Sequence, residues 1–148
     1  MRTKSITVIT LILVSLIMAL PIPVKASAPE PLEITAELWM TGENTAAGSF
    51  TTSGLFIDAG HACEVFKIAG TTIHGVKTLE GADGTITIKF QAQMTWTSQT
   101  TGVAKGSFVI ISGTNAYQNL HGVGGTYAEI DLATYHILAV YTGKAHFD

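Results

Sequence analysis

The side chains with the greatest potential for chemistry in this sequence are one cysteine and five histidines. His61 and Cys63 are two residues apart, so on a strand they would lie on the same face and offer two metal ligands, with His74 as a third. A metal site needs three or four converging donors, and no tight cluster in the sequence supplies them. His61 also directly follows Asp58-Ala59-Gly60, which is typical of a solvated turn. We therefore expect no bound metal and no cofactor.

Cys63 is the only thiol, so no disulfide can form within one chain. A free cysteine commonly behaves as a small buried hydrophobe, and an inert buried thiol is the simplest interpretation of Cys63. A disulfide between two copies of the chain is the alternative.

Motifs for nucleophilic or phosphate chemistry are absent. The sequence has no Gly-X-Ser-X-Gly elbow, no P-loop and no dinucleotide fingerprint. The glycine cluster at 122–125 does not precede a helical pattern, so it predicts a tight turn that enters a strand rather than a phosphate cradle. The formal charge of −3 argues against a nucleic-acid partner, because binding to phosphate draws on Lys and Arg.

The segment 1–26 has the organisation of a secretory signal peptide. Arg2 and Lys4 give a positive start, residues 6–20 are mostly apolar, and small residues precede a cleavage position after Ala26. The apolar run is short for a membrane span, and a retained N-terminal anchor is the alternative. We predict an exported protein, with no membrane attachment once the signal is removed.

Beyond the signal we predict a short extended leader at 27–31 and one domain at 32–148. Cleavage after Ala28 is less favoured, because Pro29 would directly follow the cut. Residues 27–148 contain five lysines and eleven acidic residues, hence a formal charge of −6, and no arginine. Without the planar guanidinium fork, nucleotides and sugar phosphates are poor candidates as substrates.

The domain shows a hydrophobic period of two, which is typical of strands with one dry face. Asp83-Gly84 predicts a tight hairpin turn, and Tyr117 and Leu120, three residues apart, predict one short helical turn near 114–120. The expected strands are 32–40, 50–57, 62–68, 71–79, 85–97, 103–112, 126–131 and 135–147. An antiparallel meander of this size removes its exposed edges by closing. We therefore predict an all-β fold, a single antiparallel eight-stranded β-barrel.

The C-terminal half contains a pattern of glycine-rich turns and aromatic residues. It comprises Gly106-Ser107-Phe108, then Ser112-Gly113-Thr114 through Tyr117, Leu120, Gly122 and Gly124 to Tyr127, and finally Tyr141-Thr142-Gly143-Lys144. Over about forty residues this pattern resembles the allene oxide cyclase and dirigent barrels, and their uncharacterised microbial relatives more closely. The resemblance implies an eight-stranded barrel that assembles as a dimer or trimer and that uses no cofactor.

The same resemblance implies that a carboxylate and a cysteine lining the barrel assist a cyclisation. Cys63 with Glu37 or Glu64 are the candidates for these two roles, although they match no motif position. Cys63 and Glu64 are adjacent and therefore point to opposite faces of a strand, which favours Glu37 as the partner. Dirigent chemistry is less favoured. By resemblance, those barrels also use arginines in the pocket, and residues 27–148 contain no arginine.

The dry face of the predicted barrel is rich in aromatic residues. Seven side chains are expected to line a cavity for a small apolar molecule: Phe50, Phe56, Phe90, Met94, Trp96, Phe108 and Tyr141. An eight-stranded barrel is also narrow enough to be filled by its own side chains. We therefore expect a secreted barrel that binds a small apolar ligand, with or without a cofactor-free cyclisation or isomerisation. A non-catalytic structural or interaction protein with a solid core is the alternative.

Overall fold

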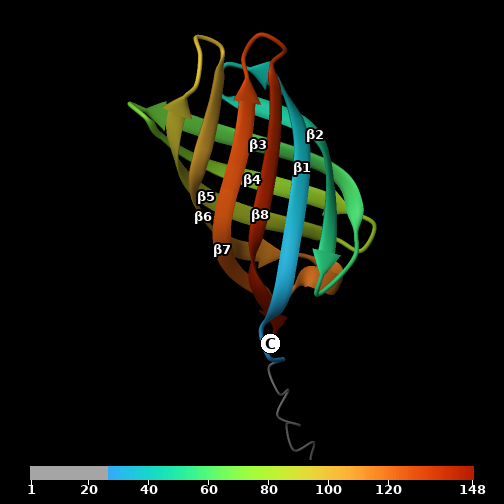
Figure 1. Ribbon diagram of the computed structural model, residues 1–148. Helices are drawn as coiled ribbons and strands as arrows, with labels where there is room; N and C mark the ends of the chain where they lie inside the picture. The colour runs from blue at the N-terminus through green and yellow to red at the C-terminus, as the bar shows by residue number, and fades with distance from the viewer. Residues whose placement is uncertain (1–26) are drawn as a thin grey trace, which may run out of the picture.

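A computed structural model describes residues 27–148, and these form a closed antiparallel barrel in which the strands follow one another in chain order (Figure 1). The prediction of an eight-stranded antiparallel barrel is thereby confirmed. The predicted signal peptide at 1–26 lies outside the described residues. Within the described part of the chain, no helix has the length and apolar character needed to cross a membrane.

Six of the eight strands are longer than the sequence pattern predicts, and β5 and β8 are each one residue shorter. They are β1 (Glu30–Gly42), β2 (Thr45–Gly54), β3 (Ala59–Ala69), β4 (Thr72–Gly81), β5 (Thr85–Trp96), β6 (Thr101–Gly113), β7 (Leu120–Asp131) and β8 (His136–Phe147). The expected helical turn is a single 3₁₀ turn, η1 (Asn115–Tyr117), between β6 and β7. The leader is also held against the end of β8, because the backbone N–H of Ser27 donates a hydrogen bond to the carbonyl of Phe147.

The first and last strands close the barrel. β1 and β8 pair without interruption from Glu30 opposite Ala145 to Trp39 opposite His136. Four hairpins (β1–β2, β3–β4, β5–β6 and β7–β8) gather at one end of the barrel, which we call the open end. The other three connections, η1 and both ends of the described chain lie at the opposite end, which we call the closed end (Figure 1).

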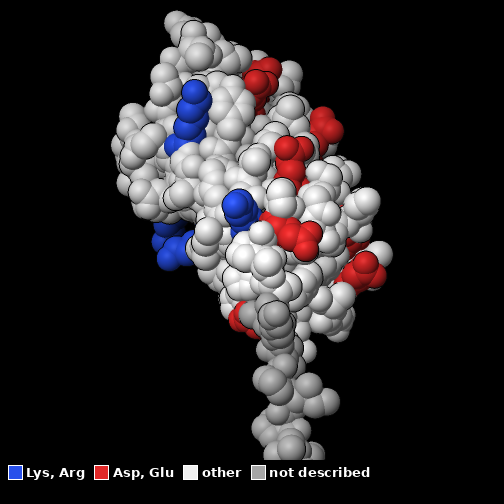
Figure 2. Space-filling model, turned by 60° about the horizontal axis from the view of Figure 1, so that its bottom comes forward, with Lys and Arg blue, Asp and Glu red and all other residues white. Residues whose placement is uncertain are grey.

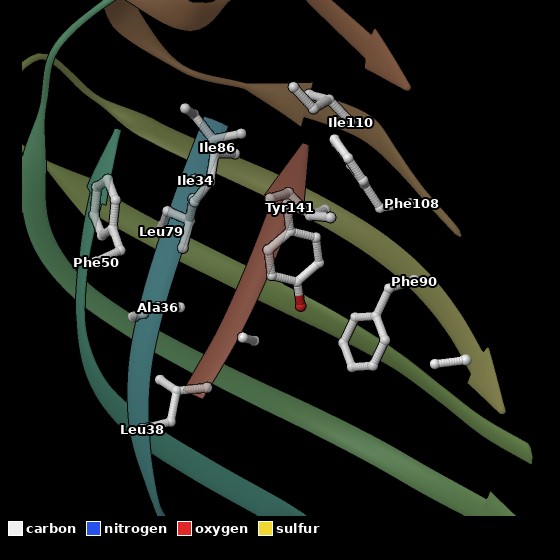
Figure 3. Packing of buried hydrophobic residues seen from close by; sticks show 14 of the residues in the cluster. Ile34, Ala36, Leu38, Phe50, Leu79, Ile86, Phe90, Phe108, Ile110 and Tyr141 are labelled. Atoms are coloured by element: carbon white, nitrogen blue, oxygen red, sulfur yellow. The ribbon is translucent and has the colours of Figure 1, made fainter. Parts of the chain in front are cut away.

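Alternation along the strands places one set of side chains inside the barrel. On β5, Ile86, Ile88, Phe90, Ala92 and Met94 are all buried, while the residues between them are not. Figure 3 shows the inward side chains of several strands meeting around Tyr141, whose hydroxyl points into the interior. The predicted dry face of this strand is therefore the barrel core.

Two glycines make room for aromatic rings in this narrow interior. A Cβ atom on Gly75 of β4 would lie 2.3 Å from the Phe90 ring, which it faces across the β4–β5 pair. A Cβ atom on Gly124 of β7 would lie 2.7 Å from the Phe108 ring. The cluster at 122–125 thus lies within β7, not in the turn that the sequence pattern predicts, because these positions need space rather than a chain reversal.

A buried carboxylate fastens the closed end. Tyr117 of η1 donates its hydroxyl to Asp58 Oδ2 at 2.7 Å, and the backbone N–H groups of Ala59 and Ala82 donate to Asp58 Oδ1 at 2.8 and 3.1 Å. Burial disfavours the charged carboxylate, but these hydrogen bonds outweigh it and hold the pKa of Asp58 below its ordinary value of 3.8. One carboxylate therefore joins the β2–β3 connection, the β4–β5 connection and η1.

We expect Tyr117→Phe to lower the free energy of unfolding by about 1.5–3 kcal/mol at pH 7, because it removes a hydrogen bond to a buried charged group. A lowered pKa means that the contribution of Asp58 is present above pH ~4 and is lost as the pH falls through the lowered value. The difference between wild type and Tyr117→Phe should therefore shrink by pH 3. Urea unfolding followed by tryptophan fluorescence measures both values.

The matched control is Tyr135→Phe, since Tyr135 is 61% exposed and should leave stability unchanged. An equal loss for Tyr117→Phe at pH 7 and pH 3 would show that the charge of Asp58 does not hold the closed end.

Candidate functional site

The open half of the barrel contains a cavity of about 250 Å³. Its wall is apolar except for Glu64, Thr126 and Tyr141. The apolar lining residues are Met40, Phe66, Ile68, Ile73, Phe90, Ala92, Met94, Trp96, Ala104, Ala128, Ile130, Leu132, Ile137 and Ala139. The arrangement is that of a small apolar container with a few polar groups on its wall.

The space arises from a row of small side chains. Ala104 on β6 pairs with Ala128 on β7, which pairs with Ala139 on β8, which pairs with Ala36 on β1. Four neighbouring strands thus present only a methyl group each at one level of the interior. We call these four residues the alanine row. Ala104, Ala128 and Ala139 line the cavity, whereas Ala36 continues the row outside its lining. Larger side chains at the three lining positions would fill this level, so their small size is the physical reason for the cavity.

The mouth of the cavity is apolar as well. Ile68, Trp96 and Leu132 come from three different strands or hairpins, line the cavity, and remain 53%, 48% and 36% exposed. Exposed apolar groups at an opening leave a hydrophobic path from solvent into the barrel.

A buried ion pair lies in the middle of the barrel. Lys77 Nζ on β4 is 3.1 Å from Glu64 Oε2 on β3, and the side chains are 0% and 6% exposed. The two residues face each other in the β3–β4 pair. Lys77 Nζ also lies 4.8 Å from the centre of the Tyr141 ring and 6.0 Å from that of Phe90, distances at which an aromatic face stabilises a cation.

The ammonium group is close to its partners but poorly aligned with them. Despite the 3.1 Å contact, Lys77 Nζ makes no hydrogen bond of good geometry with any described residue. Buried polar groups are seldom left in this state. The pair therefore retains unused hydrogen-bonding capacity inside the barrel.

Electrostatics keep Lys77 protonated. Burial would lower the pKa of Lys77, but attraction by Tyr141 and Glu64 outweighs it and raises the pKa above the ordinary 10.5. Burial likewise raises the pKa of Tyr141, so this residue is a neutral phenol at pH 7. A protonated lysine has no lone pair for attack, which excludes Lys77 as a nucleophile or as a former of Schiff bases at that pH.

The aromatic residues expected at the ligand site divide between the two halves of the barrel. Phe90, Met94, Trp96 and Tyr141 line the cavity. Phe50 and Phe108 are buried core residues outside its lining, and Phe56 packs against Tyr117 at the closed end with ring centres 4.8 Å apart.

The structure places both proposed catalytic candidates on the outside of the barrel. Cys63 alternates with the inward-facing Ala62 and Glu64 and is partly exposed. Glu37 on β1 is exposed and pairs with His136, Oε1 to Nε2, at 3.0 Å. Neither residue is among those that line the cavity, because alternation along β1 and β3 turns them outward.

The histidines do not gather into a metal site. Cys63 lies opposite Thr78, whereas His74 lies opposite Lys67, so His74 is roughly 13 Å along the strand from the level of Cys63. His121 and His146 stack at the closed end and both contact Asp148. Among residues 27–148, no group of three or more His, Cys, Asp or Glu side chains is placed to hold a metal ion.

Sequence reasoning did not single out Lys77 as a functional residue, and it set Glu64 aside in favour of Glu37. The sequence did contain a signal for these two residues. Lys77 lies at an inward position of β4, between Gly75 and Leu79, and Glu64 lies at an inward position of β3, between Ala62 and Phe66. Their pairing depends on the β3–β4 register, which a hydrophobic pattern alone does not provide.

Fold and site together define a closed eight-stranded antiparallel barrel that is packed in one half and hollow in the other, with a buried ion pair between the halves. No protein-family model, curated protein or solved structure matches this chain.

We expect Lys77→Met to lower the free energy of unfolding by about 3–5 kcal/mol, because it leaves the carboxylate of Glu64 buried without its counter-charge. The double variant Lys77→Met/Glu64→Leu removes both charges and should recover most of that loss. Urea unfolding of the single and double variants measures the difference.

The exposed pair offers a control of the same kind. Glu37→Gln removes the charge that faces His136 at the surface and should cost less than about 1 kcal/mol. A double variant as unstable as Lys77→Met would mean that the two side chains contribute by packing and not as a charge pair.

Proposed function

We propose that the protein is a secreted binding protein that holds one small, mostly apolar molecule in the open half of its barrel. The observation that carries this proposal is the apolar cavity of about 250 Å³. An apolar cavity of about 150 Å³ is sufficient to bind benzene, so this one has room for a molecule larger than a single ring. The proposal of secretion comes from the signal-like sequence of residues 1–26.

A cofactor-free cyclisation or isomerisation at the same site is the second candidate. The observation in its favour is Glu64, the only carboxylate that residues 27–148 contribute to the cavity lining. A carboxylate that faces an apolar, water-poor space can accept and return a proton during such a rearrangement. This role passes from Glu37 and Cys63 to Glu64 because only Glu64 is inside.

The alternative function, a structural or interaction protein with a solid core, predicts that side chains fill the interior throughout. That description suits the closed half, where the following side chains are at most 2% exposed: Leu32, Ile34, Leu79, Ile86 and Ile88. The alanine row supports a hollow barrel in the open half instead.

We also propose that the chain forms a dimer or trimer through its outer face. Exposed valines lie at one level of neighbouring strands, interrupted and bordered by lysines, in the order Val65, Val76, Lys89, Val109, Val123 and Lys144. Exposed apolar side chains gathered in this way favour protein–protein contact. Acidic and basic side chains gather on different sides of the view in Figure 2, which would orient two copies.

Native mass spectrometry of the protein from its own host, before and after denaturation, tests the ligand and the assembly together. We expect an additional small mass that is lost on denaturation, and a dimer or trimer in the native spectrum. A bare chain mass combined with no binding of apolar probes would contradict the proposed function.

A pair of alanine substitutions separates a hollow barrel from a solid one. Ala104→Leu adds volume to the cavity wall and should abolish ligand binding while leaving the free energy of unfolding unchanged or higher. Ala62→Leu adds the same volume at a fully buried position outside the cavity lining and should cost about 1–3 kcal/mol through overpacking.

The measurements are thermal unfolding and retention of the bound mass. Equal destabilisation by the two substitutions would show that the open half is as tightly packed as the closed half.

A further inference from the structure

The polar groups that a ligand can reach in the cavity are few. Glu64, Thr126 and Tyr141 line it, whereas Lys77 is 0% exposed and is not part of the lining. A molecule that enters from the mouth therefore meets the carboxylate of Glu64 and not the ammonium of Lys77. Tyr141 is itself only 1% exposed, so Glu64 and Thr126 offer most of the accessible polar surface.

The carboxylate of Glu64 has unused accepting capacity. Oε2 lies beside Lys77 Nζ at 3.1 Å, and no side chain or backbone N–H of the described residues donates a hydrogen bond to Oε1. A carboxylate has about four acceptor positions, and the single contact with Lys77 leaves most of them free for a donor in the cavity that Glu64 lines. Glu64 is 93% buried, since its exposure is 7%.

Charge balance restricts what can supply the missing donor. Lys77 already compensates the negative charge of Glu64, so the pair is neutral as a whole. A ligand carboxylate would bring an uncompensated charge into an apolar space and would repel Glu64. A neutral donor adds a hydrogen bond without adding a charge.

We infer that the natural ligand, if the proposed binding function holds, combines an apolar body with a neutral hydroxyl group that donates a hydrogen bond to Glu64. On β3, Glu64 lies deeper than the other lining residues, Phe66 and Ile68, which follow it toward the open end. The hydroxyl therefore enters first, and the apolar body occupies the space beside the alanine row and extends toward Trp96. Lys77 acts as a positioning residue, because its contact with Oε2 at 3.1 Å holds the Glu64 carboxylate in place without touching the ligand.

A matched set of naphthalene probes tests this inference by equilibrium dialysis. The four probes share one apolar body: 2-naphthalenemethanol carries a neutral donor, 2-acetylnaphthalene only an acceptor, 2-ethylnaphthalene neither, and 2-naphthoate a negative charge. We expect the wild-type protein to bind the alcohol about tenfold to a hundredfold more tightly than the ethyl and acetyl probes, as for a hydrogen bond to a charged group. The naphthoate should bind most weakly.

Two variants connect this preference to the ion pair. The double variant Lys77→Met/Glu64→Leu keeps an uncharged interior, so it should still bind 2-ethylnaphthalene while the preference for the alcohol disappears. In Glu64→Gln the side-chain amide offers a donor as well as an acceptor, which should move the preference toward 2-acetylnaphthalene. Glu37→Gln, the same change on the outer face, is the control and should keep the wild-type order of affinities.

The outcomes distinguish the inference from the function on which it rests. Equal binding of the alcohol and ethyl probes, tighter binding of the acetyl or naphthoate probe, or a preference that survives in the double variant would each overturn the hydroxyl assignment alone. Failure of the wild-type protein to bind any of the four probes would overturn the binding function and the inference together.

Discussion

Closure of the sheet by β1 and β8 is the constraint on which the other features of this protein depend. Once Glu30 lies opposite Ala145 and Trp39 opposite His136, every strand has two partners and the side-chain alternation assigns half of each strand to a narrow interior. Some rings fit there because the neighbouring strand has a glycine at the facing position, as Gly75 allows for Phe90. Residue size at each interior level thus decides whether the barrel is packed or hollow.

The two ends of the barrel differ in how their interior is filled. At the closed end, Asp58 collects hydrogen bonds from η1 and from two strand connections, and aromatic packing of Phe56 on Tyr117 fills the remaining space. At the open end the alanine row leaves the interior unfilled and the mouth apolar. A closed end held by hydrogen bonds can support a hollow open half, because the closed end supplies stability that the cavity does not.

The buried pair of Lys77 and Glu64 has no evident advantage for stability. Replacing a buried ion pair by apolar residues of similar volume is often neutral or favourable, and this pair is poorly aligned as well. Its position at the inner limit of the cavity gives it a different value, since it places an ionised acceptor in a space that is otherwise apolar. A buried ion pair that borders a cavity and does not stabilise the fold is the arrangement expected of functional groups.

Much of the fold follows from local features of the sequence. The period of two defines the strands, Asp83-Gly84 marks a reversal where Gly84 has a φ of +146°, and Tyr117 with Leu120 marks the single helical turn. The glycines at 122–125 do not follow from local features, because Gly124, which makes room for Phe108 on the neighbouring strand, has the same appearance in the sequence as a glycine in a turn. For the same reason, the sequence alone does not distinguish Phe90, which lines the cavity, from Phe50 and Phe108, which lie in the packed core.

By itself, then, the sequence determined the all-β class and the antiparallel meander, since the period of two and the turn residues depend on neighbours a few residues apart. Only the tertiary structure decided that Cys63 and Glu37 lie outside, that Lys77 meets Glu64, and that four alanines from four strands form one row. These features depend on strand register and on closure between the two ends of the domain. Register is fixed by packing across the whole barrel, and a pattern read along one strand does not contain it.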